Sequence, residues 1–192
     1  MSSRDFILNS IKNSKPEKFS LPEDYSFLYE DSQWVEAFKT NAEKNGAKIS
    51  FIHTEKEISD YIQLYFNQEK RIINTLQDAQ SLGDLDPHSF HDVELVVVKG
   101  LVGVAENAAI WFTETEFKNR VLPFITQNLL VVLRAKDIVP LMHEVYERIE
   151  NTDAGFSIFI SGPSKTADIE QSLVIGAHGS RSHHILIWEE ET

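Results

Sequence analysis

The sequence predicts an α/β fold in which a mostly parallel β-sheet is covered on both faces. From residue 47 onward, short apolar runs typical of strands alternate with segments whose apolar residues recur at helical spacing. The run Leu129–Leu133 is continuously apolar, as expected for a strand inside a parallel sheet. Thr54 and Glu57 have the spacing of a capping box and mark a helix after the first strand. This order of elements is typical of a sheet with crossover helices.

An N-terminal helical arm, residues 1–46, is expected to pack on a main body formed by residues 47–192. Residues 4–13 predict a short helix, after which two prolines interrupt the pattern. A second helix is expected to follow Asp31 or Ser32, because either side chain can cap it. Its apolar residues at helical spacing are Trp34, Val35, Phe38 and Ala42, with Gly46 at the C-cap position.

The elements of the main body follow from apolar runs, capping residues and turn residues. Pro123 is expected to bend a helix, whereas Pro140 falls in the first turn of another, where proline is tolerated. A long loop is expected at residues 77–92. The predicted strands are residues 47–53, 71–76, 93–98, 109–113, 129–133, 156–160 and 184–188. The predicted helices are residues 55–66, 116–126, 138–149 (capped by Asp137) and 168–173.

The composition excludes several kinds of site and partner. The chain has 18 basic and 30 acidic residues, a formal charge of −12, so no nucleic-acid or membrane partner is expected. It has no cysteine, which excludes disulfides, thiolate zinc sites, iron–sulfur ligation and cysteine nucleophiles. No apolar stretch approaches the roughly 20 residues of a membrane span. A cytoplasmic protein is therefore expected.

The segment 161–170 (SGPSKTADIE) follows a predicted strand and contains residues suited to anion binding. Ser164 or Thr166 can cap the predicted helix behind it, and free N–H groups at a helix start, with Lys165 nearby, would bind an anion. The alternative is an ordinary strand-to-helix turn with a good cap.

Glu106 and Asn107 lie between two apolar stretches, where burial of the carboxylate is expected. A buried carboxylate needs a partner or has a raised pKa, and Lys99 is one candidate partner. Two interpretations remain open: a hydrogen-bonded network that joins two strands, or a general base or nucleophile activated by burial.

Histidines form a further set of candidates. His178 lies between small residues, next to Gly179, and could act in acid–base chemistry or in a turn. His183 and His184 are adjacent and should point to opposite faces of a strand. His88 and His91 could bind a metal ion only with a third ligand, so no metal site is predicted. The motifs of dinucleotide-binding, P-loop and α/β-hydrolase proteins do not occur in the sequence.

The stretch 159–188 (FISGPSKTADIEQSLVIGAHGSRSHHILIW) resembles the closing motif of the LUD-domain family, in particular its lactate utilization protein C group. Residues 162–170 match the G-P-S-[RK]-T-A-D-I-E segment, and Gly176, His178 and Gly179 match the G-x-H-G turn. A second motif of the family, A-E-[TN]-G-[TA], resembles the text at Ala105 and Glu106. In that motif the family commonly has glycine where Ala108 stands and often threonine where Ala109 stands.

The resemblance implies a three-layer Rossmann-like sandwich of the NagB/RpiA/CoA-transferase-like type. It also implies a role in the oxidation of L-lactate to pyruvate, with the iron–sulfur lactate utilization proteins A and B as partners. Because this chain lacks cysteine, any iron–sulfur cluster would belong to those partners, and no cofactor of its own is predicted. CoA-transferases of the same fold group carry an acyl-accepting glutamate in a Glu-Asn-Gly motif, which Glu106 and Asn107 resemble in part.

Three functions follow as hypotheses. The first is an accessory, non-catalytic component of lactate oxidation that binds a small anion and its partners. The second is a CoA-transferase- or ligase-like enzyme that uses Glu106, and the third is a regulatory or scaffold domain with a vestigial pocket. Homo-oligomerisation is left open. The candidate catalytic residues are Glu106, Asp168 and His178, and the candidate ligand-binding residues are Asn107, Gly162, Ser164, Lys165, Thr166, Glu170 and Gly179.

Overall fold

The computed structural model describes residues 2–15, 33–77, 80–149, 154–167, 173–176 and 178–190. The chain divides into two units, residues 1–30 and 31–192. In the first unit, helix α1 (Ser3–Asn13) confirms the short helix predicted at 4–13. Its start is a capping box, in which Ser2 and Asp5 exchange side-chain and backbone hydrogen bonds. None of the residues of α1 is buried.

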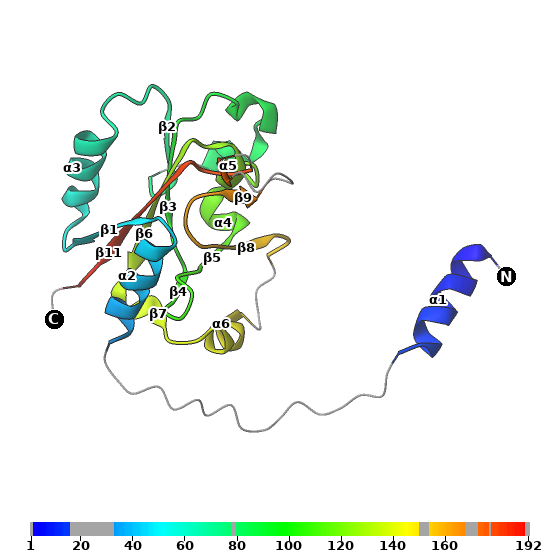
Figure 1. Cartoon of the computed structure of the whole chain (residues 1–192). Helices are drawn as coiled ribbons and strands as arrows, with labels where there is room; N and C mark the ends of the chain where they lie inside the picture. The colour runs from blue at the N-terminus through cyan, green and yellow to red at the C-terminus, as the bar shows by residue number, and fades with distance from the viewer. Residues whose placement is uncertain are drawn as a thin grey trace. The chain divides into compact units, whose positions relative to one another are not determined.

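A five-stranded parallel sheet forms the centre of the second unit (Figure 1), which confirms the predicted α/β fold with a mostly parallel sheet. The central strands are almost wholly buried and apolar, as the sequence predicted for 129–133. In spatial order the strands are β1 (Lys48–Ile52), β11 (Ser182–Trp188), β6 (Asn128–Arg134), β3 (Leu95–Lys99) and β2 (Ile72–Asn74).

The two faces of this sheet are covered differently. Helix α3 (Glu55–Tyr65) covers one face, and its Ile58 packs in a cluster with Ile52 and Leu186. Thr54 and Glu57 form the predicted capping box, since Glu57 Oε1 accepts from the Thr54 backbone N at 2.9 Å. The opposite face carries the larger core, to which helix α2 (Trp34–Lys44) contributes Phe38 and Ala42.

A second sheet of four strands packs against that larger core. Only short stretches pair in it, and β4 was not predicted because a three-residue strand has too few residues to show alternation. Its strands in spatial order are β7 (Ile138–Val139), β4 (Val102–Val104), β5 (Ile110–Thr113) and β8 (Ser157–Ile160). A separate hairpin pairs β9 (Lys165–Ala167) with β10 (Leu173–Ile175).

The structure corrects two helix predictions. Asp137 does not cap a helix, because residues 135–137 form a 3₁₀ turn, β7 follows, and α6 (Met142–Ile149) begins only after Pro140. The predicted helix 116–126 consists of two single turns, α4 (Glu114–Phe117) and α5 (Leu122–Ile125). Residues 168–172 of the helix predicted at 168–173 lie outside the described residues, and Leu173 lies in β10. Backbone pairing between segments overrides the local propensity in these places.

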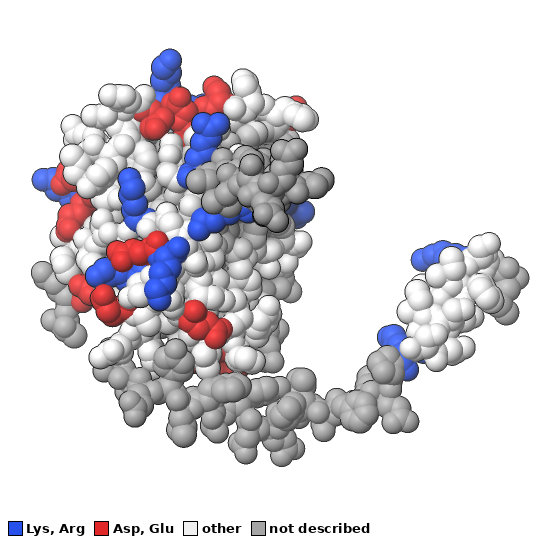
Figure 2. All heavy atoms as spheres, viewed as in Figure 1, with Lys and Arg blue, Asp and Glu red and all other residues white. Residues whose placement is uncertain are grey.

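The segment predicted as a long loop contains two 3₁₀ turns, Gln80–Asp84 and Pro87–Phe90. Arg71 holds the second turn, because its guanidinium contacts Asp92 and donates to the Ser89 carbonyl at 2.6 Å. On the face seen in Figure 2, basic and acidic side chains are interspersed. In the described part of the chain, no helix has the length and apolarity that crossing a membrane requires.

Candidate functional site

The C-terminal end of helix α2 joins the two segments that the sequence singled out. Asn45 Nδ2 donates to the Asn107 carbonyl at 3.0 Å and to Ser161 Oγ at 2.8 Å. Ser161 Oγ in turn donates to the Asn107 carbonyl at 2.8 Å. One turn earlier on the helix, Asn41 Nδ2 donates to the Ala105 carbonyl at 2.8 Å. Segments 105–108 and 161–165 therefore meet at one place, although more than fifty residues separate them in sequence.

Segment 105–108 is the tip of the β4–β5 hairpin. Val104 and Ala109 close the hairpin through a backbone hydrogen bond of 2.8 Å. Ala108 has a φ of 55°, in the left-handed region that favours glycine, which agrees with the glycine common at this place in the motif it resembles. Asn107 Oδ1 accepts from the Ala109 backbone N at 2.9 Å and stabilises this turn.

The structure corrects the expectation that Glu106 is buried. Its side chain is exposed, because the hairpin tip directs it away from the two apolar strands. Glu106 Oε1 accepts a hydrogen bond from the Met142 backbone N at 2.8 Å, at the start of α6. Lys99 is therefore not the partner of Glu106. The partner is a backbone N–H in the first turn of α6.

Segment 161–165 turns at Gly162 and brings Lys165 to the end of α2. Gly162 has a φ of 78°, and a Cβ there would lie 2.7 Å from the Asn45 carbonyl oxygen, so glycine is required. Lys165 Nζ donates to the same Asn45 oxygen at 2.6 Å. The last carbonyls of a helix carry partial negative charge, which favours an ammonium group here. Lys165 and Ser161 are both exposed to solvent.

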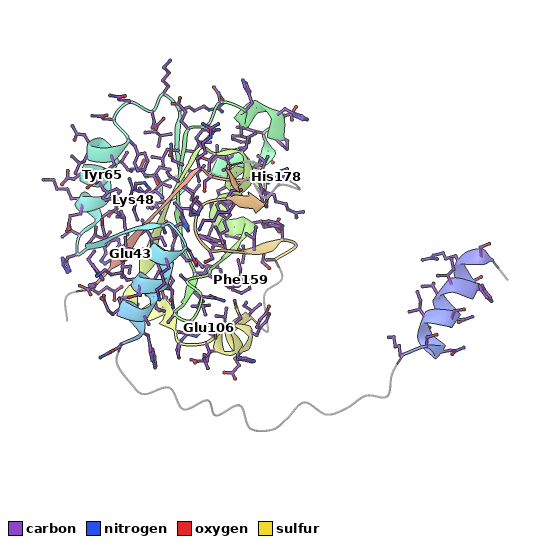
Figure 3. All side chains as sticks on the ribbon, in the orientation of Figure 1. Glu43, Lys48, Tyr65, Glu106, Phe159 and His178 are labelled. Atoms are coloured by element: carbon purple, nitrogen blue, oxygen red, sulfur yellow. The ribbon has the colours of Figure 1, made fainter. Side chains whose placement is uncertain are left out.

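The structure also places Ser164, His178 and Gly179. Ser164 N donates to the Ser180 carbonyl at 2.9 Å, and a Cβ on Gly179 would lie 3.2 Å from the Ser164 Cβ. His178 is exposed beside this contact. Figure 3 shows Glu106 beside α6 and His178 beside β9, far apart in the molecule, so the structure does not bring these two candidate catalytic residues together.

Three sequence candidates follow Lys165 in the chain. Thr166 lies in β9, where it pairs with Val174. Asp168 and Glu170 lie outside the described residues. Lys165–Ala167 is a strand, and the helix start predicted at Asp168 lies outside the described residues.

Two functional candidates were missed at the sequence level, Asn41 and Asn45. They are four residues apart, so they lie on the same side of α2. That spacing is the signal the sequence offers, but amides at this spacing are common on exposed helix faces. Only the fold reveals that both face the 105–107 carbonyls.

His183 and His184 point to opposite faces of β11, as predicted. His184 Nδ1 lies 2.9 Å from Tyr61 Oη, on the α3 side. Burial lowers the pKa of His184 to about 4, with a smaller effect from the Lys48 charge. Burial also lowers the pKa of His183 to about 4, and the His184 charge adds to this.

His183 is fully buried, and neither ring nitrogen has a hydrogen-bond partner among the described residues. The Gly162 backbone lies close enough to favour the charged form of His183 slightly, without the geometry of a hydrogen bond. Burial outweighs this contact, so His183 is neutral beneath the Gly162 turn.

The described residues hold no group of three or more His, Asp or Glu side chains that could bind a metal ion. His91 Nδ1 lies 3.1 Å from the His88 carbonyl oxygen, so these two residues form a local turn contact. A surface pocket of about 440 Å³ lies between α3 and β2 and is lined in part by Phe66, Glu69 and Ile72. Burial, followed by the nearby Glu94 carboxylate, raises the pKa of Glu69.

Residues 87–188, more than half of the chain, match the family model of the LUD domain. Lactate utilization protein C of Bacillus pumilus (strain SAFR-032) is 34% identical over 94 residues, which is 45% of this chain and 39% of that protein. The uncharacterized protein YkgG of Escherichia coli (strain K12) is 31% identical over 100 residues, 49% of this chain and 43% of that protein. The chain thus spans about two fifths of the length of the curated relatives it matches.

The fold is also similar to a solved structure. The crystal structure of a DUF162 family protein from Deinococcus radiodurans superposes with a TM-score of 0.61 and 14% sequence identity. The match covers 81% of this chain and 96% of that chain, so the two share a fold. Both loops that meet at Asn45, 105–108 and 161–165, lie inside the segment that the family model matches. The chain belongs to the LUD domain family.

Proposed function

We propose that this chain is an accessory component of L-lactate oxidation that binds a small anionic ligand where loop 105–108 meets segment 161–165. Relatives named lactate utilization protein C support the lactate role. The observation that carries the proposal is the junction itself, where an exposed ammonium and an exposed hydroxyl, Lys165 and Ser161, meet at Asn45.

The contacts at this junction suggest how a carboxylate would bind. Lys165 Nζ is held at 2.6 Å by a carbonyl oxygen, that of Asn45, which a ligand carboxylate can replace as the acceptor. Ser161 Oγ and the Asn45 amide already donate within the junction, so they hold the two loops in place and leave the Lys165 ammonium as the donor to the ligand. Under this proposal, the junction is shaped by the backbone of four candidate residues, Asn107, Gly162, Ser164 and Gly179.

The remaining candidate residues from the sequence have secondary roles in this proposal. Thr166 follows Lys165 in β9, and Asp168 and Glu170, which lie outside the described residues, follow it in the sequence; all three stay candidates. His178 would contribute from the Ser164 side, since it precedes Gly179. Under this proposal none of these residues performs chemistry on lactate.

The proposal assigns the redox chemistry to partners. The chain has no cysteine with which to ligate an iron–sulfur cluster. We therefore assign the clusters to the iron–sulfur lactate utilization proteins A and B, with which this chain would associate in the cytoplasm.

Growth on L-lactate tests the proposal in a strain that lacks the gene. The wild-type chain should restore growth, Lys165→Gln should restore it poorly, and Lys56→Gln, an exposed lysine on α3, should behave as wild type. A tagged wild-type chain purified from lactate-grown cells should bring down proteins with iron–sulfur absorption. Full growth with Lys165→Gln together with a pull-down free of iron–sulfur proteins would refute the proposal.

The accessibility of Glu106 favours a second candidate, acyl transfer from a thioester. An exposed carboxylate can attack the thioester carbonyl of acyl-CoA, breaking the C–S bond, releasing the thiolate and forming a mixed anhydride. Hydroxylamine would convert that anhydride to a hydroxamate on Glu106 that mass spectrometry detects. Absence of any modification after incubation with acyl-CoA would exclude this activity, and a Glu106→Gln chain provides the blank.

A further inference from the structure

At the carboxyl edge of the parallel sheet, the chain leaves different strands toward different faces. The chain leaves β1 into α3, which packs on one face of the sheet, with Ile58 against Ile52. It leaves β6 toward β7, whose Ile138 packs in the core on the opposite face. Strand β11 lies between these two strands, and ligands of open α/β sheets bind outside the carboxyl ends of the strands. Figure 1 shows β1 and β11 ending at this edge.

Two cations lie where β6 ends at this edge. Arg134 is the last residue of β6 and pairs in register with Trp188 of β11, and Lys136 follows in the 3₁₀ turn Ala135–Asp137. Both side chains are about half exposed, at 45% and 55%. The junction at Asn45, by contrast, is built on loops outside the parallel sheet, so these cations form a separate group.

Both cations contact a carboxylate of the chain itself, that of Glu190. Glu190 Oε2 lies 2.6 Å from Lys136 Nζ, and its Oε1 lies 3.5 Å from Arg134 Nε. The backbone that carries it is fixed one residue earlier, because Glu189 N donates to the Ile52 carbonyl of β1 at 2.9 Å. The hydrogen bond from Lys136 lowers the pKa of Glu190, as do the nearby charges.

We propose that Arg134 and Lys136 form a binding site for small carboxylates at this edge, and that Glu190 occupies the site until such a ligand displaces it. The Glu190 carboxylate shows which chemistry the two cations hold, one oxygen for each. Exposed ion pairs of this kind are individually weak, so an external carboxylate can compete with Glu190. Residues 189–190 thereby set the threshold concentration at which the site fills.

Amide NMR titration of the full chain with sodium acetate, against sodium chloride at equal ionic strength, tests this proposal. Acetate should shift the resonances of residues 134–136 and 188–190. Glu190→Gln should tighten acetate binding there about two- to fivefold, the factor of one exposed ion pair. Glu189→Gln, its matched neighbour, should leave the affinity unchanged, and Arg134→Gln with Lys136→Gln should abolish the shifts.

Equal acetate affinity in the wild-type and Glu190→Gln chains would overturn the proposal, as would shifts that do not map to residues 134–136. Lys165→Gln separates this site from the junction at Asn45. That change should remove anion-dependent shifts at residues 161–165 while those at residues 134–136 persist. Loss of both sets of shifts in Lys165→Gln would also contradict a separate site.

Discussion

At the scale of single residues, Ala108, His183 and His184 have the most unusual environments. Ala108 is buried and occupies a left-handed backbone conformation in the hairpin turn, where most residues with a Cβ are strained. The sequence could not reveal this strain, since alanine is ordinary in a strand end. The only indication in the sequence was its resemblance to a motif that commonly has glycine at this position.

Ala108→Val should destabilise the chain more than Ala109→Val. Both changes add the same two methyl groups at buried positions, but only the first forces a β-branched residue to a φ of 55°. The extra loss is expected to be about 1–2 kcal/mol, because a β-branched side chain adds to the left-handed strain that Ala108 already bears. Urea unfolding of the two variants measures it, and equal losses would show that residue 108 does not have the left-handed conformation.

His183 and His184 should make stability fall in mild acid. Both have a pKa of about 4 in the folded chain, below the ordinary value of 6.5, so the unfolded chain binds more protons between these values. The stabilisation from keeping them neutral is present above pH 6.5 and is lost as the pH falls toward 4. Each histidine should cost about 2 kcal/mol at pH 5 relative to pH 8.

His183→Leu isolates one of the two contributions. Leucine fills a similar apolar space and has no buried nitrogen that lacks a partner. Urea unfolding at pH 8, 6 and 5 should show about half the pH dependence of the wild-type chain. An unchanged slope would mean that His183 is not buried and neutral as described.

At the scale of elements, helix α2 is the piece that joins the two candidate loops. Its amphipathic face was predictable from Phe38 and Ala42, and both are buried. Its role in the site was not predictable, because Asn45 bonds to Asn107 and Ser161, which lie 62 and 116 residues away in sequence. Sequence periodicity reports which face of a helix is buried, whereas these contacts depend on how distant loops are folded.

Asn45→Ala should destabilise the chain by about 1–2 kcal/mol through the loss of two hydrogen bonds to loops 105–108 and 161–165. Lys44→Ala, its exposed neighbour on the same helix, should change stability by less than about 0.5 kcal/mol. Thermal or urea unfolding compares them. A loss that is the same for both variants would show that Asn45 does not join the loops.

At the scale of the whole molecule, the parallel sheet was the most predictable part. Its central strands are long, buried on both faces and therefore continuously apolar, as in Leu129–Leu133. The short strands β7, β9 and β10 were not predictable, because two or three residues pair only when the rest of the fold brings them together. For the same reason Glu106 was expected in the core but lies exposed on a hairpin tip.

The central claim is that a small carboxylate binds where Lys165, Ser161 and Asn107 meet. Amide NMR titration of the full chain with L-lactate, at constant ionic strength, tests it most directly. The account predicts saturable shifts at residues 105–108 and 161–165 that disappear in Lys165→Gln and persist in Lys56→Gln. Shifts that are absent from these residues, or that survive unchanged in Lys165→Gln, would contradict it.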